Sequence, residues 1–596
     1  MNAGQANTWE RSQQAIDVEI ESLKESIRAL KSRRNAFSPI SSLPPEVFAV
    51  IFSFSCLPGR SSLDGKPFHL ARLFVSHVCH RWRQMALDQP LLWSHVDFTA
   101  LSLAAATETL VRTKSTPLHL EANFSDHRWD DVRSSAFRKE LQARILHVRH
   151  LRISAKPTHL LRTLERFVSP APTLQHLSLS SHRQHQNRRI GRRLFIPDTL
   201  FDGSTPRLSC LELRNCNICW KSPLLKGLNR LEIFTPSLNA RPKLADWLGA
   251  LDEMPQLTTL TLHSASPIAP PLPFEVQRTV TLPSLTHLDI LASLGDHAFA
   301  LAHLDLPALT WLCLTTLSSR LPNSSEVQKL LTYIAQHAHG SQDTVPLQSV
   351  YVHSKDDHVD ILAWSVPNID AEADDPPTLL ATTLPTRVAL SIRNNGWLDA
   401  YKRLNILNMV MESLPLDSLV TLAAHDLSGN PNDQGLQTQH FWSPRSLEWP
   451  LLQRVRLAPP AAHGFMLMML EDNGGREVLR LPSLTELVVV DYSLYELSLL
   501  PLRDALMKRV EQGIPVKTLD LRMCVPDLDA PVEDWFLSLS ELAVNVLGPE
   551  TSETREQMES MWETVARGPF VDIYDSREDN HSESSDTGSD DEEEVE

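Results

Sequence analysis

"PQLTTLTLH", residues 255–263, has a proline at its start and leucines at positions 257, 260 and 262. The arrangement returns as "PSLTHLDIL" at 283–291, "PALTWLCLT" at 307–315 and "PSLTELVVV" at 482–490. Apolar residues at every second position are typical of a strand with one buried face. The proline marks the turn into the strand. A short strand that recurs along the chain indicates a repeated architecture.

Weaker copies of this Leu-x-x-Leu-x-Leu pattern extend the series in both directions, from "SHVDF" at 94–98 to "LSELAVNV" at 539–546. Segments 158–168, 242–254, 325–338 and 502–513 have helical apolar spacing and are expected to be return helices. The pattern is a leucine-rich-repeat signature and predicts an irregular α/β solenoid, with parallel strands and helical or irregular returns. The predicted middle apolar residues of its strands are Leu151, Leu177, Leu211, Leu231, Leu260, Leu288, Leu312, Val350, Val388, Val420, Val455, Leu487, Leu519 and Leu542.

The concave face of such a solenoid is lined by the residues between the strand leucines. An exposed tryptophan and tyrosine among mixed charges there predict a protein-binding surface. The alternative is that these are ordinary solvated strand residues. The predicted target-binding set is Arg230, Glu232, His287, Asp289, Trp311, Tyr351, Arg454, Arg456, Asp520 and Arg522.

The first 36 residues are predicted to be helical. Five apolar residues between positions 16 and 30 recur at spacings of 4, 3, 4 and 3, which is an a/d seam. This seam allows self-association through residues 16–30 as a coiled coil. The alternative is a single amphipathic helix that folds back on the body. The seam residues are Ile16, Ile20, Leu23, Ile27 and Leu30.

A second helical region starts with "SPISSLPPEVFAVIFSF", residues 38–54. Ser41 or Ser42 is expected to cap a helix whose apolar face combines positions 47, 50, 51 and 54. The segment "LARLFVSHVCHRWRQMA", residues 70–86, predicts one further helix, and the unit ends near "PLLW" at 90–93. So small a unit cannot bury all of this apolar surface, which points to a partner.

Residues 43–93 resemble the F-box, over about fifty residues: "LPPEVFAVIF", "VSHVCHRWRQMA" and "PLLW" carry its Leu-Pro, Val-Cys, basic-Trp and Leu-Trp elements in order. The connection between Phe52 and Leu73 is longer than is usual. The Ser-Pro-Ile lead-in at residues 38–40, after the short heptad helix, resembles fungal F-box proteins. The resemblance implies binding to the Skp adaptor of a cullin–RING ubiquitin ligase, with Leu43, Pro44, Ile51, Phe52 and Trp82 as the contacts. The implied adaptor-binding set is Leu43, Pro44, Glu46, Val47, Ile51, Phe52, Val78, Cys79 and Trp82.

The resemblance and the repeats together suggest a substrate receptor, in which the F-box binds the adaptor and the solenoid holds a protein target for ubiquitination. Such a chain acts by proximity and is not itself an enzyme. The alternative is an interaction scaffold outside any ligase, with a degenerate F-box. A third alternative, an enzyme with a site between solenoid loops, has no support from nucleotide-binding, hydrolase or metalloprotease motifs.

Composition agrees with a protein-binding role. The net charge is −17, of which −10 lies after residue 574, so no basic nucleic-acid surface is indicated. No run of 18 apolar residues predicts a membrane span, and the N-terminus is unlike a secretory signal. We therefore expect a location in the cytoplasm, the nucleus or both, without cofactors. Neither Cys216 with Cys219 nor His77, Cys79 and His80 form a convincing metal set, so no metal site is predicted.

Four segments are predicted: a helix at 1–36, an F-box helical domain at 38–98, the solenoid at 99–570 and a disordered acidic tail at 571–596.

Overall fold

The computed structural model describes the chain in segments. These are residues 3–55, 68–124, 131–182, 194–234, 241–270, 274–318, 324–339, 346–355, 358–367, 387–394, 400–426, 442, 449–458, 461–471, 480–490, 496–522, 524, 539, 542 and 545–547. The predicted acidic tail lies outside these residues.

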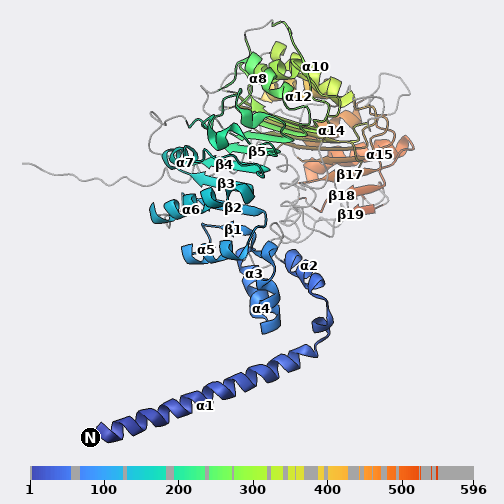
Figure 1. Cartoon of the computed structure of the whole chain (residues 1–596). Coiled ribbons are helices and arrows are strands. Elements are labelled where there is room, and N and C mark those ends of the chain that lie inside the picture. The colour runs from blue at the N-terminus through green and yellow to red at the C-terminus, as the bar shows by residue number, and fades with distance from the viewer. Residues whose placement is uncertain are drawn as a thin grey trace, which may run out of the picture. The chain divides into compact units, whose positions relative to one another are not determined.

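The chain forms two compact units, Met1–Leu228 and Asn229–Glu596. The first begins with helices and continues as strands that alternate with helices (Figure 1). Its helical elements are α1 (Ala3–Ala36), η1 (Pro39–Ser42), α2 (Pro45–Ser55), α3 (Phe68–His77), α4 (His80–Leu87), η2 (Pro90–Trp93), α5 (Leu103–Arg112), α6 (Asp131–Arg144), η3 (Ile145–His147), α7 (Pro157–Leu164), η4 (Leu200–Gly203) and η5 (Pro223–Leu225).

The strands of the first unit pair in parallel, each with the next one in the chain. Buried and half-buried residues alternate along β2 and β4, as the Leu-x-Leu pattern predicts. The register aligns the predicted middle residues, so Leu151, Leu177 and Leu211 form one buried row. The strands are β1 (His95–Asp97), β2 (Leu118–Asn123), β3 (Val148–Ala155), β4 (His176–Ser181) and β5 (Cys210–Arg214).

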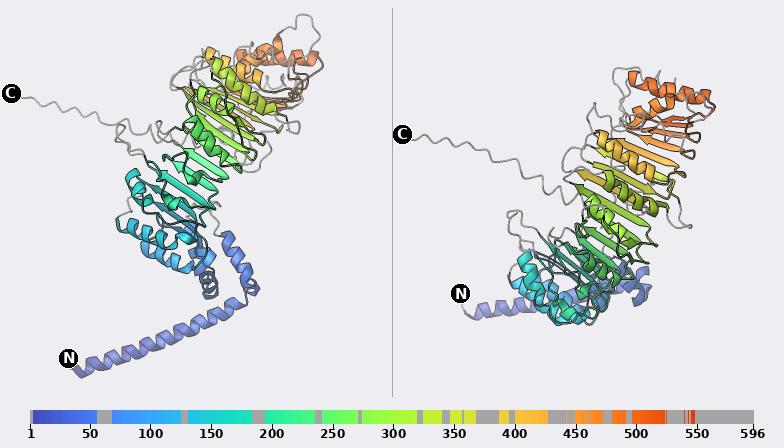
Figure 2. Two further views of the ribbon diagram at one scale, coloured as in Figure 1. Left: turned by 45° about the horizontal axis from the view of Figure 1, so that its top comes forward. Right: turned by 90° about the horizontal axis from the view of Figure 1, so that it is seen from above.

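The second unit stacks more strands in the same way (Figure 2). They are β6 (Arg230–Phe234), β7 (Thr259–His263), β8 (Val280–Thr281), β9 (His287–Ala292), β10 (Leu304–Asp305), β11 (Trp311–Ser318), β12 (Ser349–Lys355), β13 (His358–Trp364), β14 (Val388–Asn394), β15 (Thr421–Asp426), β16 (Arg454–Leu457), β17 (Glu486–Val489), β18 (Thr518–Asp520) and β19 (Asn545–Leu547). Its helices are α8 (Leu244–Asp252), α9 (Leu294–Ala302), α10 (Ser324–His339), α12 (Ala400–Ser413), α14 (Ala461–Leu470) and α15 (Glu496–Glu511).

The four predicted return helices are confirmed as α7, α8, α10 and α15. They bury apolar residues, as Leu160 and Leu164 of α7 illustrate. Within the described part of the chain, no helix combines the length and apolar character that spanning a bilayer requires.

The strand order of the second unit departs from a simple solenoid at β12 to β14. β14, not β12, pairs in parallel with β11, and β12 pairs in parallel with β15. β13 fills the space between β12 and β14 and is antiparallel to both. The expected succession of Leu312, Val350 and Val388 is therefore wrong in space, because Val388 is the residue that lies beside Leu312.

Two of the predicted middle residues are also wrong. Leu422, not Val420, is aligned with Val455, and Val546, not Leu542, is aligned with Leu519. Both errors fall in weak copies of the repeat, where another apolar residue a few positions away satisfies the same pattern.

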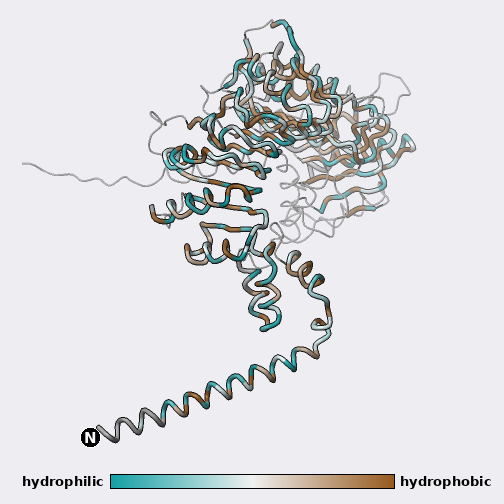
Figure 3. The backbone as a smooth tube through the Cα atoms, viewed as in Figure 1, coloured by the Kyte–Doolittle hydropathy of each residue, from teal (hydrophilic) through white to brown (hydrophobic). Residues whose placement is uncertain are grey.

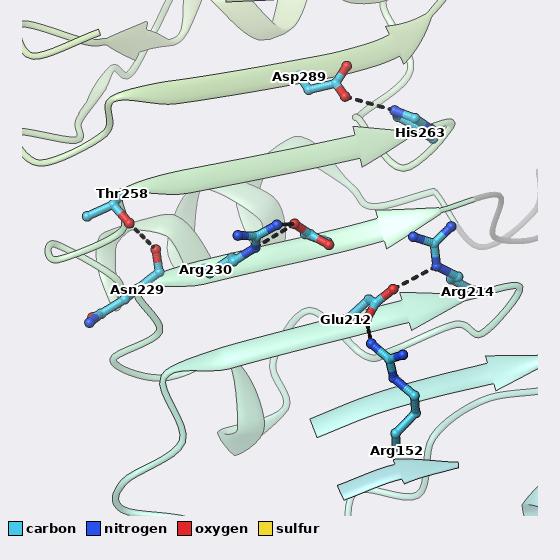
Figure 4. Close-up of polar contacts among 9 residues, drawn as sticks. Arg152, Glu212, Arg214, Asn229, Arg230, Thr258, His263 and Asp289 are labelled. Carbon is cyan, nitrogen blue, oxygen red and sulfur yellow. Dashed lines mark hydrogen bonds and ion pairs between the residues drawn. The ribbon is translucent and has the colours of Figure 1, made fainter. Parts of the chain in front are cut away.

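Threonine hydroxyls connect successive repeats at the start of the strands. The Oγ1 of Thr258 donates a hydrogen bond to the carbonyl of Asn229 at 2.9 Å (Figure 4). Thr286 repeats this contact to the carbonyl of Thr258 at 3.1 Å, and Thr310 to that of Thr286 at 3.0 Å. The Leu-Thr pair of the repeat therefore combines a core residue with a residue that joins one repeat to the next.

Candidate functional site: an apolar helical surface and a polar strand face

Helix α2 begins without a serine cap. Its N-terminal position is Pro44, whose carbonyl accepts hydrogen bonds from the N–H groups of Val47 and Phe48. Ser41 and Ser42 lie in η1, where their hydroxyls donate to the carbonyls of residues 35 and 39. The expected cap was wrong, because these serines close the preceding turn.

The predicted helix at 70–86 is two helices, α3 and α4, with a break at Val78 and Cys79. Cys79 has an extended backbone, with φ −158° and ψ 171°, and is the N-cap of α4. Val78 is 59% exposed, so it does not pack with Trp82 on the buried face. The break turns α4 against α2, where Trp82 meets the phenylalanines of α2.

Three aromatic rings form the centre of this helical unit. Phe48 and Phe52 lie one turn apart on α2 with ring centroids 5.8 Å apart, and Trp82 lies 5.5 Å from Phe48 and 5.4 Å from Phe52. Both phenylalanines are fully buried, while Leu43 and Ile51 pack at the edge of this cluster. Rings at these separations pack favourably beyond the area they bury.

Trp93, at the end of η2, joins the helical unit to the strands of the first unit. It is buried, and its indole Nε1 donates to the carbonyl of Ala86 at 2.8 Å. The guanidinium of Arg112, from α5, lies 4.6 Å from the ring centroid of Trp93. Arg72 lies 5.7 Å from the same ring and donates to the carbonyl of His95, in β1, at 2.6 Å. These contacts connect the helical unit to β1 and α5.

The opposite side of α2 is an exposed apolar surface. Val47, Val50 and Phe54 are 39%, 54% and 60% exposed and lie at helical spacing on one side. Figure 3 shows how apolar α2 is. We call Pro44, Val47, Val50 and Phe54 the α2 outer face. Because α2 is apolar on two sides and buries only one of them, its exposed side is suited to docking a partner.

The implied adaptor residues divide between these two sides. Phe52 was expected to contact the adaptor, and this is wrong, because it is 1% exposed in the helical core. Leu43, Ile51, Cys79 and Trp82 are half-buried. Pro44, Glu46, Val47 and Val78 are exposed and available to a partner. The sequence had placed Val50 and Phe54 on the apolar face but omitted them from the adaptor-binding set.

Comparison with known families explains this arrangement. Residues 40–99 match the family model described as F-box-like. This region is an F-box-like domain. F-box domains generally bind the Skp adaptor within cullin–RING ligases, so the domain supports a role as an adaptor-binding protein. No curated protein matches the chain.

Polar side chains on the strands pair with one another across and along each unit's sheet (Figure 4). In the first unit, Glu212 accepts a hydrogen bond from Arg214 at 2.7 Å and lies 3.9 Å from Arg152. In the second, Arg230 donates to Glu232 at 2.6 Å. These pairs lie on the side of the strands predicted to face a target.

The ten predicted target-binding residues have different environments. Arg230 and His287 are exposed; Asp289, Trp311, Arg454 and Arg522 are half-buried. The remaining four are nearly buried, which contradicts their expected exposure: Glu232, Tyr351, Arg456 and Asp520. Most of the charged members already have a partner within the chain, since His263 contacts Asp289, Arg454 contacts Glu486 and Arg522 contacts Asp520.

Tyr351 is the clearest correction. It is 3% exposed and packs in an apolar cluster with residues of the neighbouring strands, against which Trp311 also rests. The cluster forms because the positions between the strand leucines are themselves apolar in these repeats. The second face of the sheet is therefore buried here. Its members are Leu291, Cys313, Tyr351, Leu362, Trp364, Ala389 and Ala423.

A histidine ladder on the first unit was missed by the sequence reasoning. His95, His119, His150 and His176 are aligned on β1 to β4. The rings of His119 and His150 stack at 3.9 Å, and those of His150 and His176 at 4.0 Å. Burial and neighbouring positive charge lower the pKa of His119 to about 4 and that of His150 to about 3. His119 and His150 are therefore uncharged at neutral pH, and the half-buried ladder presents a row of polar rings.

Cys216 is buried, whereas Cys219 is exposed. The Cys216 thiol is buried and lies 3.3 Å from the carbonyl of Arg214. Burial raises the pKa of this thiol to about 12, which opposes the thiolate that zinc needs.

Proposed function

We propose that the chain is a substrate-recognition subunit of a Skp–cullin–F-box ubiquitin ligase. The F-box-like domain binds the adaptor, and the strand faces bind a protein target. The chain contributes proximity and no bond chemistry: a held target presents its lysines at high effective concentration to the ubiquitin-conjugating enzyme. Such a role places it in the cytoplasm, the nucleus or both.

The α2 outer face is the observation that carries the proposal. Phe48, Phe52 and Trp82 form the core of the domain, and Trp93 packs against the same cluster and donates a hydrogen bond to Ala86. The exposed valines and phenylalanine are therefore not needed for the core and remain for a partner. Burying a side chain of this kind completely contributes about 1.5–3 kcal/mol.

The test is adaptor binding by the full chain carrying Val50→Asp and Phe54→Asp. Two carboxylates in a desolvated apolar contact are expected to weaken binding at least about a hundredfold. Binding to the purified Skp adaptor is measured by calorimetry, and folding by circular dichroism. Val111→Asp, at a residue 60% exposed on α5, is the matched control and should bind normally.

Wild-type chain that is folded but does not bind the adaptor would contradict the ligase role and favour a scaffold with a degenerate F-box. Normal binding by the folded double variant would show that the adaptor uses another surface. Target recognition is tested separately, by ubiquitination of captured proteins in the reconstituted ligase.

The polar face of the first unit supports target binding there. The histidine ladder, Glu121, Arg152 and Arg214 present hydrogen-bonding groups of both charges on adjacent strands. Mixed polar groups on a rigid sheet favour specific recognition over nonspecific attraction. We infer in addition that α1 is a self-association helix, since all five residues of its seam are exposed.

A further inference from the structure

A compact group of metal-ligand side chains lies in the second unit, at the point where the strand order changes. The antiparallel register of β12 and β13 puts His353 opposite Asp360. His358 lies two residues before Asp360 and so on the same side of β13. β14 adds Ser391 opposite Asp360 and Arg393 opposite His358. Three strands therefore bring these polar side chains to one place.

The distances in this group fit a metal ion. One ligand atom each from His353, His358 and Asp360 lies within 4.8 Å of the others. The Nε2 of His358 is 3.6 Å from the Oδ2 of Asp360, and the two imidazole rings have centroids 5.1 Å apart. Zinc bonds of about 2.0–2.2 Å in a tetrahedron place ligand atoms about 3.4 Å apart. Small side-chain movements are enough to reach that geometry.

The surroundings orient the carboxylate as metal sites require. Ser391 Oγ donates to the Oδ1 of Asp360 at 2.5 Å and accepts from Arg393 Nε at 3.0 Å. This leaves the Oδ2 of Asp360 turned toward His358. A hydrogen bond to the oxygen that does not bind the metal fixes the orientation of a ligating carboxylate and supports its affinity for the ion. Asp360 and His358 are buried, while His353 is half-buried and provides access from solvent.

Charge decides which ion fits. The group contains one carboxylate and two imidazoles, a set that suits zinc and related transition metals rather than calcium or magnesium. Arg393 Nη2 lies 3.7 Å from the Oδ2 of Asp360, so this guanidinium balances the carboxylate when no ion is bound. The positive charge of Arg393 lowers the affinity of the site for a cation. It also favours hydroxide or another anion as the fourth ligand of a bound ion.

We propose that His353, His358 and Asp360 bind one divalent transition-metal ion, with zinc as the best fit. The ion joins β12 to β13 beside β14, the three strands that interrupt the solenoid order. It has a structural role there, because it fixes the antiparallel strand β13 to β12.

The test uses the full chain, stripped with a chelator and titrated with Co²⁺ and then Zn²⁺. Wild type should bind one Co²⁺ with the visible absorption of a tetrahedral site, and Zn²⁺ should displace it. His358→Gln with Asp360→Asn should weaken binding at least tenfold. His263→Gln is the matched control, because His263 also contacts an aspartate, Asp289, but belongs to no three-residue metal-ligand group among the described residues.

Because Asp360 is buried, its variant can fail to fold, and circular dichroism will report this. His353→Gln, at a half-buried residue, then decides the question and should also weaken Co²⁺ binding at least tenfold. Saturating Zn²⁺ should raise the melting temperature of wild type but not that of a folded variant. Equal Co²⁺ affinity in wild type and in folded His353→Gln, or no tetrahedral Co²⁺ signal in wild type, overturns the proposal and leaves an ion-pair cluster only.

Discussion

Phe52 and Phe54 are two positions apart on α2 and have opposite surroundings. Phe52 is 1% exposed against Phe48 and Trp82, and Phe54 is 60% exposed. We therefore expect Phe52 to contribute to the stability of the domain and Phe54 to contribute to adaptor binding. The same substitution at each position gives different results.

Phe52→Ala is expected to destabilise the F-box-like domain by about 3–5 kcal/mol, because it leaves a cavity in an aromatic cluster. Phe54→Ala is expected to change stability by less than about 0.5 kcal/mol, and to weaken adaptor binding instead. Urea unfolding and adaptor titration measure the two effects. Equal loss of stability in both variants would contradict the division of α2 into an inner and an outer side.

The sequence indicated a helix here but not which side is buried. In "EVFAVIFSF" nearly every position is apolar, so the helical period fits two faces equally well. The buried side is chosen by Trp82, and the position of that ring depends on the break at Cys79. Nothing local in the sequence marks the break, because Cys79 is the N-cap but its side chain makes no capping hydrogen bond.

At the scale of elements, α1 is a 34-residue helix with an unburied seam. Ile16, Ile20, Leu23, Ile27 and Leu30 are between 43% and 62% exposed. A seam this exposed is available to a partner helix. The ion pair of Glu21 with Lys24, at 3.0 Å, lies on the exposed surface and contributes little.

Replacing Leu23 and Ile27 by aspartate should abolish self-association through α1, because charges at a/d positions oppose a coiled-coil seam. Sedimentation velocity of the full chain over a range of concentrations measures this. Lys24→Asp, outside the seam, is the control. A wild-type chain that stays monomeric at high concentration would show that the seam serves another partner.

The strands were the most predictable elements. Leu-x-Leu after a proline placed β7, β9, β11 and β17, because burial of two alternating leucines determines the register. β13 was missed, since the repeat pattern assumes parallel strands. The metal-ligand group was missed for the same reason: His353 and Asp360 meet only through antiparallel pairing.

For the whole molecule, buried histidines make stability depend on pH. Burial lowers the pKa of His119, His297 and His337 to about 4 and that of His150 to about 3. In the unfolded chain these groups take up protons near pH 6.5. Between about pH 6.5 and 4 the unfolded state thus binds more protons, and stability falls as the pH falls.

The melting temperature should therefore be constant above about pH 7 and decrease steadily from pH 6.5 toward 4. The double variant His119→Gln, His150→Gln should show a smaller decrease, because two of these groups no longer take up protons on unfolding. His159→Gln, at an exposed histidine of α7, is the control. Scanning calorimetry across this range measures the slopes, and identical slopes in all three proteins would contradict the explanation.

The change of strand order at β13 has a consequence for how the chain folds. Elsewhere within each unit, consecutive strands pair with a near neighbour in sequence, so structure can grow one repeat at a time. β11 pairs on one side with β9, which precedes it, but its other partner, β14, follows only after β12 and β13, so growth on that side must wait. Closing that long loop first is slow. We expect this point to limit the folding rate, and a chain cut there to expose a strand edge prone to aggregation.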